Sequence, residues 1–340
     1  MIWYIVKRVA YMLGVLVATS FIIYFVYNLL PVDKAADMAM QEIAANKHLI
    51  YAERYLYWQR RYGLDGNLLV RYLRWLGAYP FYDGSFNGLL QGNLGSSIAY
   101  GKPVVEVIKT PLLNTLSLNL VAAVLALGIT VPLGVYCAVH RGGKRDTAVQ
   151  IATIIGYGLP VFIVAILFIW LFAVKLRWFP VSGMSSVGKE YTGFRAFLDR
   201  AWHFGLPLIV MTFCSLGGMT RYARASMTEA LRLDCIRTAR AKGLKESTVI
   251  LAHAFRNALV PLVSLVVGWL VGVFSGSIMI ENIFGINGIG KVYFDALTAN
   301  DNEIALAMQL FYILLALVGN LLTDIAYGLV DPRIRINGGA

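Results

Sequence analysis

The stretch RVAYMLGVLVATSFIIYFVYNLL, residues 8–30, has no charged side chain after Arg8 and no proline. It is longer than the roughly 20 mostly apolar residues with which a helix crosses the hydrocarbon core of a bilayer. Basic residues before an apolar run also occur in secretory signal peptides, but their apolar part has only about 7–15 residues. No small-x-small cleavage site follows closely. We therefore predict a retained first membrane helix.

Outward from this stretch, the same pattern recurs along the whole chain. Of its 340 residues, 58% are hydrophobic and 14% are charged, whereas soluble domains have about 25% charged residues. Six long apolar runs exclude an ordinary soluble core. We expect an all-α polytopic membrane protein with six transmembrane helices. The apolar runs lie near residues 9–30, 113–138, 150–174, 203–220, 258–280 and 304–328.

The net charge of +11 reports membrane topology rather than nucleic-acid binding. Cytoplasmic loops of membrane proteins are enriched in Lys and Arg. Residues 221–257 include eight basic and three acidic side chains, whereas 281–303 include four acidic side chains and only Lys291 as a base. We expect both termini in the cytoplasm of a bacterial or archaeal cell, in a multi-pass protein of the plasma membrane. Nucleic acid is not an expected partner.

The chain is expected to divide into four parts along its length. Residues 1–30 form the N-terminal membrane helix and 31–110 an extracytoplasmic cap or scaffold, too long for an idle loop. Residues 111–330 form a core of five further membrane helices, with a basic cytoplasmic loop at 221–257. Residues 331–340 form a cytoplasmic tail.

The cap is expected to be mainly helical. The sequence EIAANKHLIYAERYLYWQRRYGLDGNLLVRYLRWLG, residues 42–77, is typical of two short amphipathic helices separated at Gly63. In the first of these, Leu49, Ala52 and Leu56 share one helical face. The pattern therefore predicts that this face is apolar.

Two apparent motifs do not support chemistry on this chain. GINGIGKV, residues 285–292, resembles a phosphate-binding loop, but Val292 stands where a hydroxyl must hold Mg²⁺. The three cysteines (Cys137, Cys214 and Cys235) and four histidines show no metal-ligand spacing. We expect no catalytic residue, no metal site and no cofactor on this chain.

Asp324 is the main ionisable residue inside a predicted membrane helix. Such residues are functional candidates or pair with another charge. Asp324 lies about two turns from the cytoplasmic end, which favours a structural ion pair with Arg333 or Arg335. No ladder of ionisable residues crosses the bilayer, which argues against a proton-coupled pump and against a voltage sensor.

Residues 227–261, MTEALRLDCIRTARAKGLKESTVILAHAFRNALVP, have the signals of a capped helical hairpin. Asp234 is expected to cap a short helix and Gly243 to end it, while Ser247 is expected to cap the next helix. Pro261 predicts a kink. A loop that only anchors topology needs no caps in this order. We therefore expect a docking surface for a cytoplasmic partner, with a plain positive-inside loop as the alternative.

At this point the chain resembles a known family. Glu229-Ala230-Leu231, DCIRTARAKGL (234–244) and RNALVP (256–261) resemble the EAA loop of binding-protein-dependent ABC importers, most closely the dipeptide and oligopeptide permeases. The resemblance covers nearly the whole chain, and Asn287 stands where the family's turn usually has proline. Its other segments are YGLD (62–65), GNLGSS (92–97), KPVVEVI (102–108), NTLSLNL (114–120), ENIFGINGIG (281–290) and DPRIR (331–335).

The resemblance implies a type I ABC importer permease fold and a specific set of partners. These are a homologous second permease, two cytoplasmic ATPases that bind ATP and Mg²⁺, an extracytoplasmic substrate-binding protein and the lipid bilayer. The coupling helix would be residues 234–243, and short peptides would be the cargo. The residues implied to dock the ATPase are Glu229, Ala230, Asp234, Arg237, Ala239, Arg240, Ala241, Lys242, Gly243 and Leu244.

Other functions remain open at the level of sequence. Nickel chelates or oligosaccharides are alternative cargoes for the same machinery. A stand-alone channel or secondary carrier would transport without ATPases and would not need residues 229–243. A membrane anchor or receptor-like scaffold would support no flux. The capped loop and the lack of a charge ladder favour the importer.

Overall fold

The computed structural model of the chain describes residues 2–31 and 33–330. Most of this length is helical, which confirms the predicted helical class. The described part contains no β-strand beyond one isolated bridge between Ser96 and Pro103. Helices suit a bilayer because each satisfies its own backbone hydrogen bonds.

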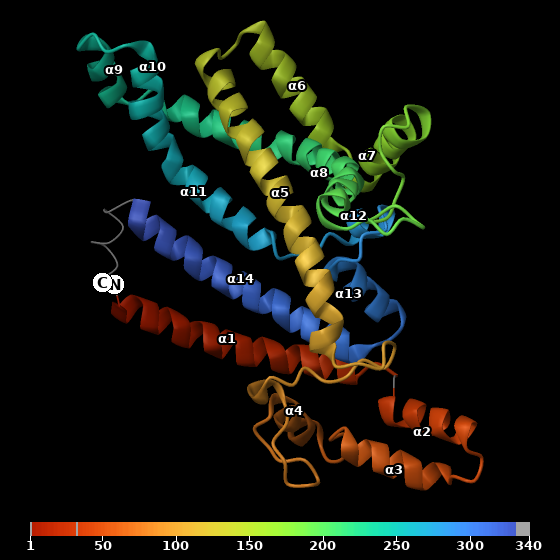
Figure 1. The fold of residues 1–340 in the computed structure, drawn as a ribbon. Coiled ribbons are helices and arrows are strands. Elements are labelled where there is room, and N and C mark those ends of the chain that lie inside the picture. The colour runs from red at the N-terminus through yellow and green to blue at the C-terminus, as the bar shows by residue number, and fades with distance from the viewer. Residues whose placement is uncertain (1, 32, 331–340) are drawn as a thin grey trace. The chain divides into compact units, whose positions relative to one another are not determined.

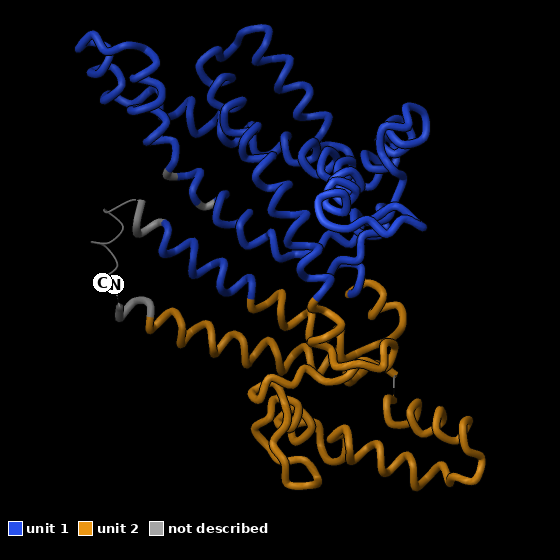
Figure 2. The backbone as a smooth tube through the Cα atoms, in the orientation of Figure 1, with its two compact units in different colours: residues 1, 110–292, 315–340 blue, residues 2–109, 293–314 orange. Residues whose placement is uncertain are grey.

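The chain folds into two compact units, coloured separately in Figure 2. Unit 2 contains residues 2–109 and 293–314, so it combines two segments that lie far apart in the sequence. Unit 1 contains residues 110–292 and the described residues from 315 onward.

Unit 2 begins with the first apolar helix and continues through three short helices. The helices in this order are α1 (Ile2–Asn28), α2 (Lys34–Ala45), α3 (Tyr51–Arg61), α4 (Leu68–Leu76) and the single turn η1 (Leu89–Gln91).

Most of the remaining helices belong to unit 1, and three of them cross its boundary with unit 2. Those three are α5 (Val104–Val139), α13 (Ile289–Thr298) and α14 (Asn302–Val330). The others are α6 (Lys144–Gly158), α7 (Val161–Phe168), η2 (Ile169–Lys175), α8 (Gly193–Ala230), α9 (Asp234–Ala241), α10 (Glu246–Thr248), η3 (Val249–Ala254), α11 (Phe255–Gly272) and α12 (Ile278–Ile283).

Four helices of the described chain are long and apolar enough to cross a membrane. They are α1, α5, α8 and α14. Two further candidates are bent pairs that pass the same test together, so the described residues hold four candidate spans, or six if each pair counts as one. All six apolar runs of the sequence therefore coincide with one of these helices or pairs.

The two bent pairs both break beside a proline. Lys144–Gly158 and Val161–Lys175 meet at 102°, next to Pro160, and Glu246–Leu259 and Pro261–Gly272 meet at 60°. The kink predicted at Pro261 is confirmed. Proline removes a helical hydrogen bond and clashes with the preceding turn, so a helix often breaks there. Pro132, however, lies inside the continuous helix α5.

In unit 2 an aromatic cluster joins α1 to α4. Tyr24 and Tyr72 are both buried, together with Leu306 from α14. The hydroxyl of Ser20 and that of Tyr72 share a 2.8 Å hydrogen bond. These contacts explain why α1, read from sequence as an isolated membrane helix, belongs to unit 2.

The short helices of unit 2 depart from the sequence prediction in two ways. The helix α2, capped by Asp33, was not predicted. Leu49 precedes α3, and Leu56 on that helix is 49% exposed, so the expected apolar face is not core. The separation at Gly63 is correct, because its φ of +66° ends α3 in a left-handed turn.

Candidate functional site

The candidate docking surface is a hairpin at one end of unit 1, formed by α9 and α10 (Figure 1). It follows the long helix α8, which ends at Ala230 after burying Met227 and Ala230. The chain then enters α9 through Leu233, whose backbone is extended. The hairpin returns through η3 into α11, so it is fixed at both ends by membrane-length elements.

The start of α9 differs from the prediction. Leu233 occupies the N-cap position without a side-chain hydrogen bond, and Asp234 is the first helical residue. An acid in the first turn still favours the helix dipole, although it does not cap an N–H group. Ser247 is likewise not a cap, because Lys245 precedes α10 and Ser247 lies within it.

The end of α9 is formed as predicted. Gly243 has a φ of +74° in the position after the C-cap Lys242. Its N–H donates to the carbonyl of Arg240 at 2.9 Å, and the N–H of Leu244 donates to Ala239 at 3.4 Å. This pair of bonds is a Schellman motif, which satisfies the last carbonyls of the helix and stops it sharply.

One face of α9 is buried in unit 1. Ile236 is fully buried and Ala239 is 5% exposed, at the i, i+3 spacing of one helical face. They pack in one cluster with Met227 and Ala230 of α8, and with Val249 of η3. Burying these side chains holds α9 against α8 and η3, so the helix is part of the core of unit 1.

The opposite face of α9 is exposed and basic. Arg237, Arg240, Ala241 and Lys242 are all exposed, as is Asp234. The Arg237–Asp234 pair, at 3.3 Å, has side chains that are 78% and 93% exposed, and such surface pairs contribute only about 0–1 kcal/mol. The face therefore remains available to a partner.

The predicted docking residues thus fall into two groups. Ala230 and Ala239 are buried supports of α9, and Glu229 is exposed one turn before it. Arg240 braces the hairpin itself, because its Nη2 and Nε donate to the Glu246 carboxylate of α10 at 2.6 and 3.2 Å. The other predicted residues, Leu244 included, are exposed on or beside α9. Their role in docking stays a prediction.

Asp324 lies in α14, within the described chain. Its predicted partners Arg333 and Arg335 lie outside the described residues.

An ion pair next to the hairpin was missed from the sequence. Arg224 of α8 donates to both carboxylate oxygens of Asp146, and Asp146 is buried at the start of α6. Asp146 is the one acid of the basic loop 140–149, but its burial, which makes a cationic partner necessary, is visible only in the structure. Close packing supports the pair: a Cβ on Gly217 of α8 would meet the backbone of α6 at Thr153.

A second polar site surrounds Glu281 of α12, a helix of unit 1 that lies away from the α9 hairpin (Figure 1). The Glu281 carboxylate is 1% exposed. It accepts the Thr115 hydroxyl at 2.9 Å and the Lys291 N–H at 2.8 Å. Burial raises the pKa of this carboxyl above its usual range.

The glycines of the apparent phosphate loop are explained by this carboxylate. A Cβ on Gly288 would collide with the Glu281 side chain, and one on Gly290 would come within 3.0 Å of it. Glycine is required where a backbone approaches another group this closely. The loop therefore wraps an internal carboxylate of the same chain.

The sequence matches a family model and several known proteins. The family model described as "Binding-protein-dependent transport system inner membrane component" matches residues 130–336, which include α9 and its supports. The oligopeptide transport system permease protein AppB of Bacillus subtilis is 34% identical over 98% of this chain and 99% of its own length. The dipeptide transport system permease protein DppB of Escherichia coli K12 is 32% identical, over 98% and 99%.

The fold has a match among solved structures. A structure titled "Inward facing conformations of the MetNI methionine ABC transporter: CY5 native crystal form" contains a similar chain, with a TM-score of 0.50 at 16% identity. The match covers 65% of this chain and 97% of the other. At this identity the similarity concerns the fold alone.

Proposed function

Because the chain belongs to the family of binding-protein-dependent transport system inner membrane components, we propose that it forms half of a translocation pathway for short peptides. The proposal of peptide cargo rests on relatives named as oligopeptide and dipeptide permeases, aligned over nearly their full length. In this proposal the chain crosses the plasma membrane six times, with each bent pair counted as one span, and both termini are cytoplasmic.

The observation that carries the mechanism is the construction of α9. Its inner face is buried through Ile236 and Ala239, and its outer face is exposed and basic. A helix held in this way moves with the elements behind it, so a push on its outer face reaches α8 and α11. We propose that α9 is the coupling helix, seated on a cytoplasmic ATPase that binds ATP and Mg²⁺.

The other subunits of the proposed importer are separate partner proteins. A second, homologous permease completes the pathway, two ATPase subunits supply the hydrolysis of ATP, and a substrate-binding protein delivers cargo outside. The part of unit 2 between α1 and α5 lies on the outer side in this arrangement. The chain itself performs no catalysis.

Affinity purification tests the proposal. The chain is isolated from its native membrane in a mild detergent, and every co-purifying protein is identified. We expect two ATPases and a second permease with the wild type, and loss of the ATPases from Arg240→Glu and Gly243→Glu. Lys144→Glu, an exposed charge reversal at the start of α6, is the matched control and should retain them. A wild type that purifies alone contradicts the importer.

A further inference from the structure

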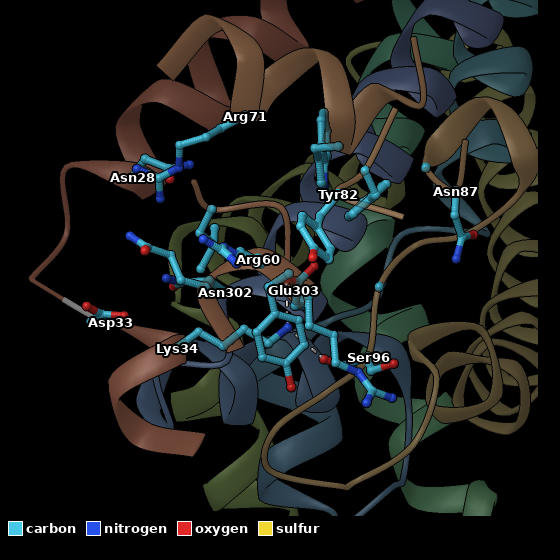
Figure 3. A pocket seen from close by; sticks show the side chains of 18 of the residues that line it. Asn28, Asp33, Lys34, Arg60, Arg71, Tyr82, Asn87, Ser96, Asn302 and Glu303 are labelled. Carbon is cyan, nitrogen blue, oxygen red and sulfur yellow. Dashed lines mark hydrogen bonds and ion pairs between the residues drawn. The ribbon is translucent and has the colours of Figure 1, made fainter. Parts of the chain in front are cut away.

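Unit 2 contains a cavity of about 1040 Å³, shown in Figure 3. Its walls come from the end of α1, the start of α2, α3 and α4, the segment around residues 81–96 and the start of α14. Ligand pockets in proteins typically measure about 300–1,000 Å³. The volume therefore suits a small organic ligand or a short peptide.

Two acidic side chains of the cavity wall are already bound within unit 2. Asp33 caps α2 and accepts the Tyr55 hydroxyl at 2.9 Å. Asp83 accepts the N–H and the hydroxyl of Ser85 at 3.0 and 2.6 Å, and these bonds hold the pKa of Asp83 below its usual range. Among the described residues, neither carboxylate lies within 4.0 Å of an arginine nitrogen.

A third acid, Glu303, is paired with the only lysine of the wall. Its carboxylate lies 2.8 Å from the Lys34 ammonium group, which also donates to the Ser96 carbonyl at 3.2 Å. The Lys34 Nζ lies 4.2 Å from the centre of the Tyr62 ring. Figure 3 shows Lys34 and Glu303 meeting inside the cavity. This pair is internally satisfied.

Three arginines of the wall have no such partner. Within the described chain, no carboxylate oxygen lies within 4.0 Å of Arg60, Arg61 or Arg71. Arg60 rests on the Tyr82 ring at 5.2 Å, and the Nε of Arg71 is buried without a hydrogen-bond partner among the described residues. Guanidinium groups bind carboxylates bidentately, so the wall offers an anion site.

The fourth acidic side chain of the cavity wall, Glu53, lies on the same helix as Arg60, α3. Glu53 is in the first turn of α3 and exposed, whereas Arg60 is in the last turn. Residues seven apart share a helical face and lie about 10 Å apart along the axis. Between them, Leu56 is 49% and Tyr57 41% exposed, and both line the cavity. Along α3, the cavity wall therefore presents an anionic group, then two largely apolar side chains, then a cationic group.

We propose that this cavity binds a short zwitterionic peptide, with its α-carboxylate at Arg60 and its terminal ammonium group at Glu53. An extended chain rises at most about 3.3–3.6 Å per residue, so the axial rise of about 10 Å between positions 53 and 60 matches a peptide of about three residues. The guanidinium of Arg71 adds a second donor for the anion. That this peptide is the transported cargo rests on the proposed function; the binding site itself rests on the cavity.

Titration calorimetry on the full chain in lipid nanodiscs tests the site with trialanine as the probe. We expect trialanine to bind, and C-terminal amidation or N-terminal acetylation each to weaken binding about tenfold. In Arg60→Gln the preference for the acid over the amide should be much reduced, with Arg71 as the remaining donor. In Glu53→Gln, an exposed position, the free and acetylated peptides should bind equally. Lys47→Gln, an exposed lysine outside the cavity wall, is the control and should leave all affinities unchanged.

Several outcomes would overturn the inference. These are equal affinity of trialanine and its amide for the wild type, variants that match Lys47→Gln, or inorganic phosphate that binds where trialanine does not. The last result would assign the arginines to phosphate or a lipid headgroup. If ATPases co-purify but trialanine does not bind, only this site is wrong. If trialanine binds but the ATPases never co-purify, the importer assignment fails and the site stands.

Discussion

The guanidinium of Arg224 in α8 donates two hydrogen bonds to the carboxylate of Asp146 in α6, over 2.7 and 2.6 Å. The Asp146 carboxylate also accepts the N–H of Gly142 at 2.9 Å. The side chain of Asp146 is 3% exposed and that of Arg224 is 23% exposed. This pair joins the first turn of α6 to the last two turns of α8, the helix that leads into α9.

Loss of the arginine from this pair should destabilise unit 1. Arg224→Ala leaves Asp146 buried without its partner, and breaking a buried pair in this way costs about 3–5 kcal/mol. Thermal unfolding can be followed with a thiol-reactive fluorophore, because Cys137 is buried and reacts only on unfolding. The exposed Cys235 and the half-buried Cys214 are first replaced by serine.

The control for this variant is Arg237→Ala, which breaks an ion pair whose side chains are 78% and 93% exposed. It should unfold close to the wild-type temperature, since exposed pairs have a small effect. Equal unfolding temperatures for Arg224→Ala and Arg237→Ala would show that the buried pair of Arg224 and Asp146 does not stabilise unit 1.

The carboxyl of Glu281 should make stability depend on pH. Burial raises its folded-state pKa above the usual 4.5, so the folded protein favours the protonated form. The wild type should therefore gain stability relative to Glu281→Gln as the pH falls from neutral toward 4.5, and lose it as the pH rises. Unfolding temperatures of both proteins across this range measure the difference. A difference that instead grows with rising pH would mean that the hydrogen bonds from Thr115 and Lys291 outweigh burial.

Alanine at Gly243 should loosen the end of α9 without a steric clash. The φ of +74° is strained for an L-residue by about 1–2 kcal/mol, whereas a Cβ there would meet nothing within 4 Å. Hydrogen exchange in residues 234–244 should accelerate about tenfold, which corresponds to about 1.4 kcal/mol. Gly268→Ala, within α11 and equally uncrowded, should leave the exchange of α9 unchanged. Unaltered exchange in Gly243→Ala would rule out the role of Gly243 as the stop of α9.

Reversing the Arg240–Glu246 pair separates bracing from docking. In the native protein the two charged groups lie 2.6 Å apart, and the double variant Arg240→Glu/Glu246→Arg keeps an acid opposite a base at these positions. The helix α9 should therefore stay folded, as measured by circular dichroism and hydrogen exchange. Its outer face nevertheless changes charge at one position, and we expect binding of the ATPase to weaken at least tenfold. Full binding by the double variant would assign Arg240 to bracing alone.

Much of the architecture could be predicted because hydropathy acts over whole segments. All six apolar runs correspond to membrane-length helices or bent pairs, and Gly243 stops α9 where its left-handed conformation was expected. Local signals of this kind depend on a few neighbouring residues. They were strong enough to find the exposed, basic face of α9.

Long-range pairings could not be predicted in the same way. Nothing in the local pattern joins residues 293–314 to the first 109, because that contact depends on Leu306 packing with Tyr24 and Tyr72. The N-caps predicted at Asp234 and Ser247 were wrong by one and two positions, because the helical backbone begins after Leu233 and after Lys245. Both residue types are good N-caps, so the sequence alone did not reveal the earlier start. The sequence places Glu53, Arg60 and Arg61 on one helix, but only the folded unit brings Arg71 and Tyr82 to the same cavity.

The most direct test of the coupling proposal uses Cys235, the exposed thiol native to α9. A photoreactive maleimide is attached to it in native membranes, and the cross-linked product is identified by mass spectrometry. The account predicts a product with the ATPase at Cys235, and little or none when the label is carried by Lys144→Cys in a Cys235→Ser background. Cross-links from Cys235 only to lipid or to other copies of this chain would contradict the assignment of α9 as the coupling helix.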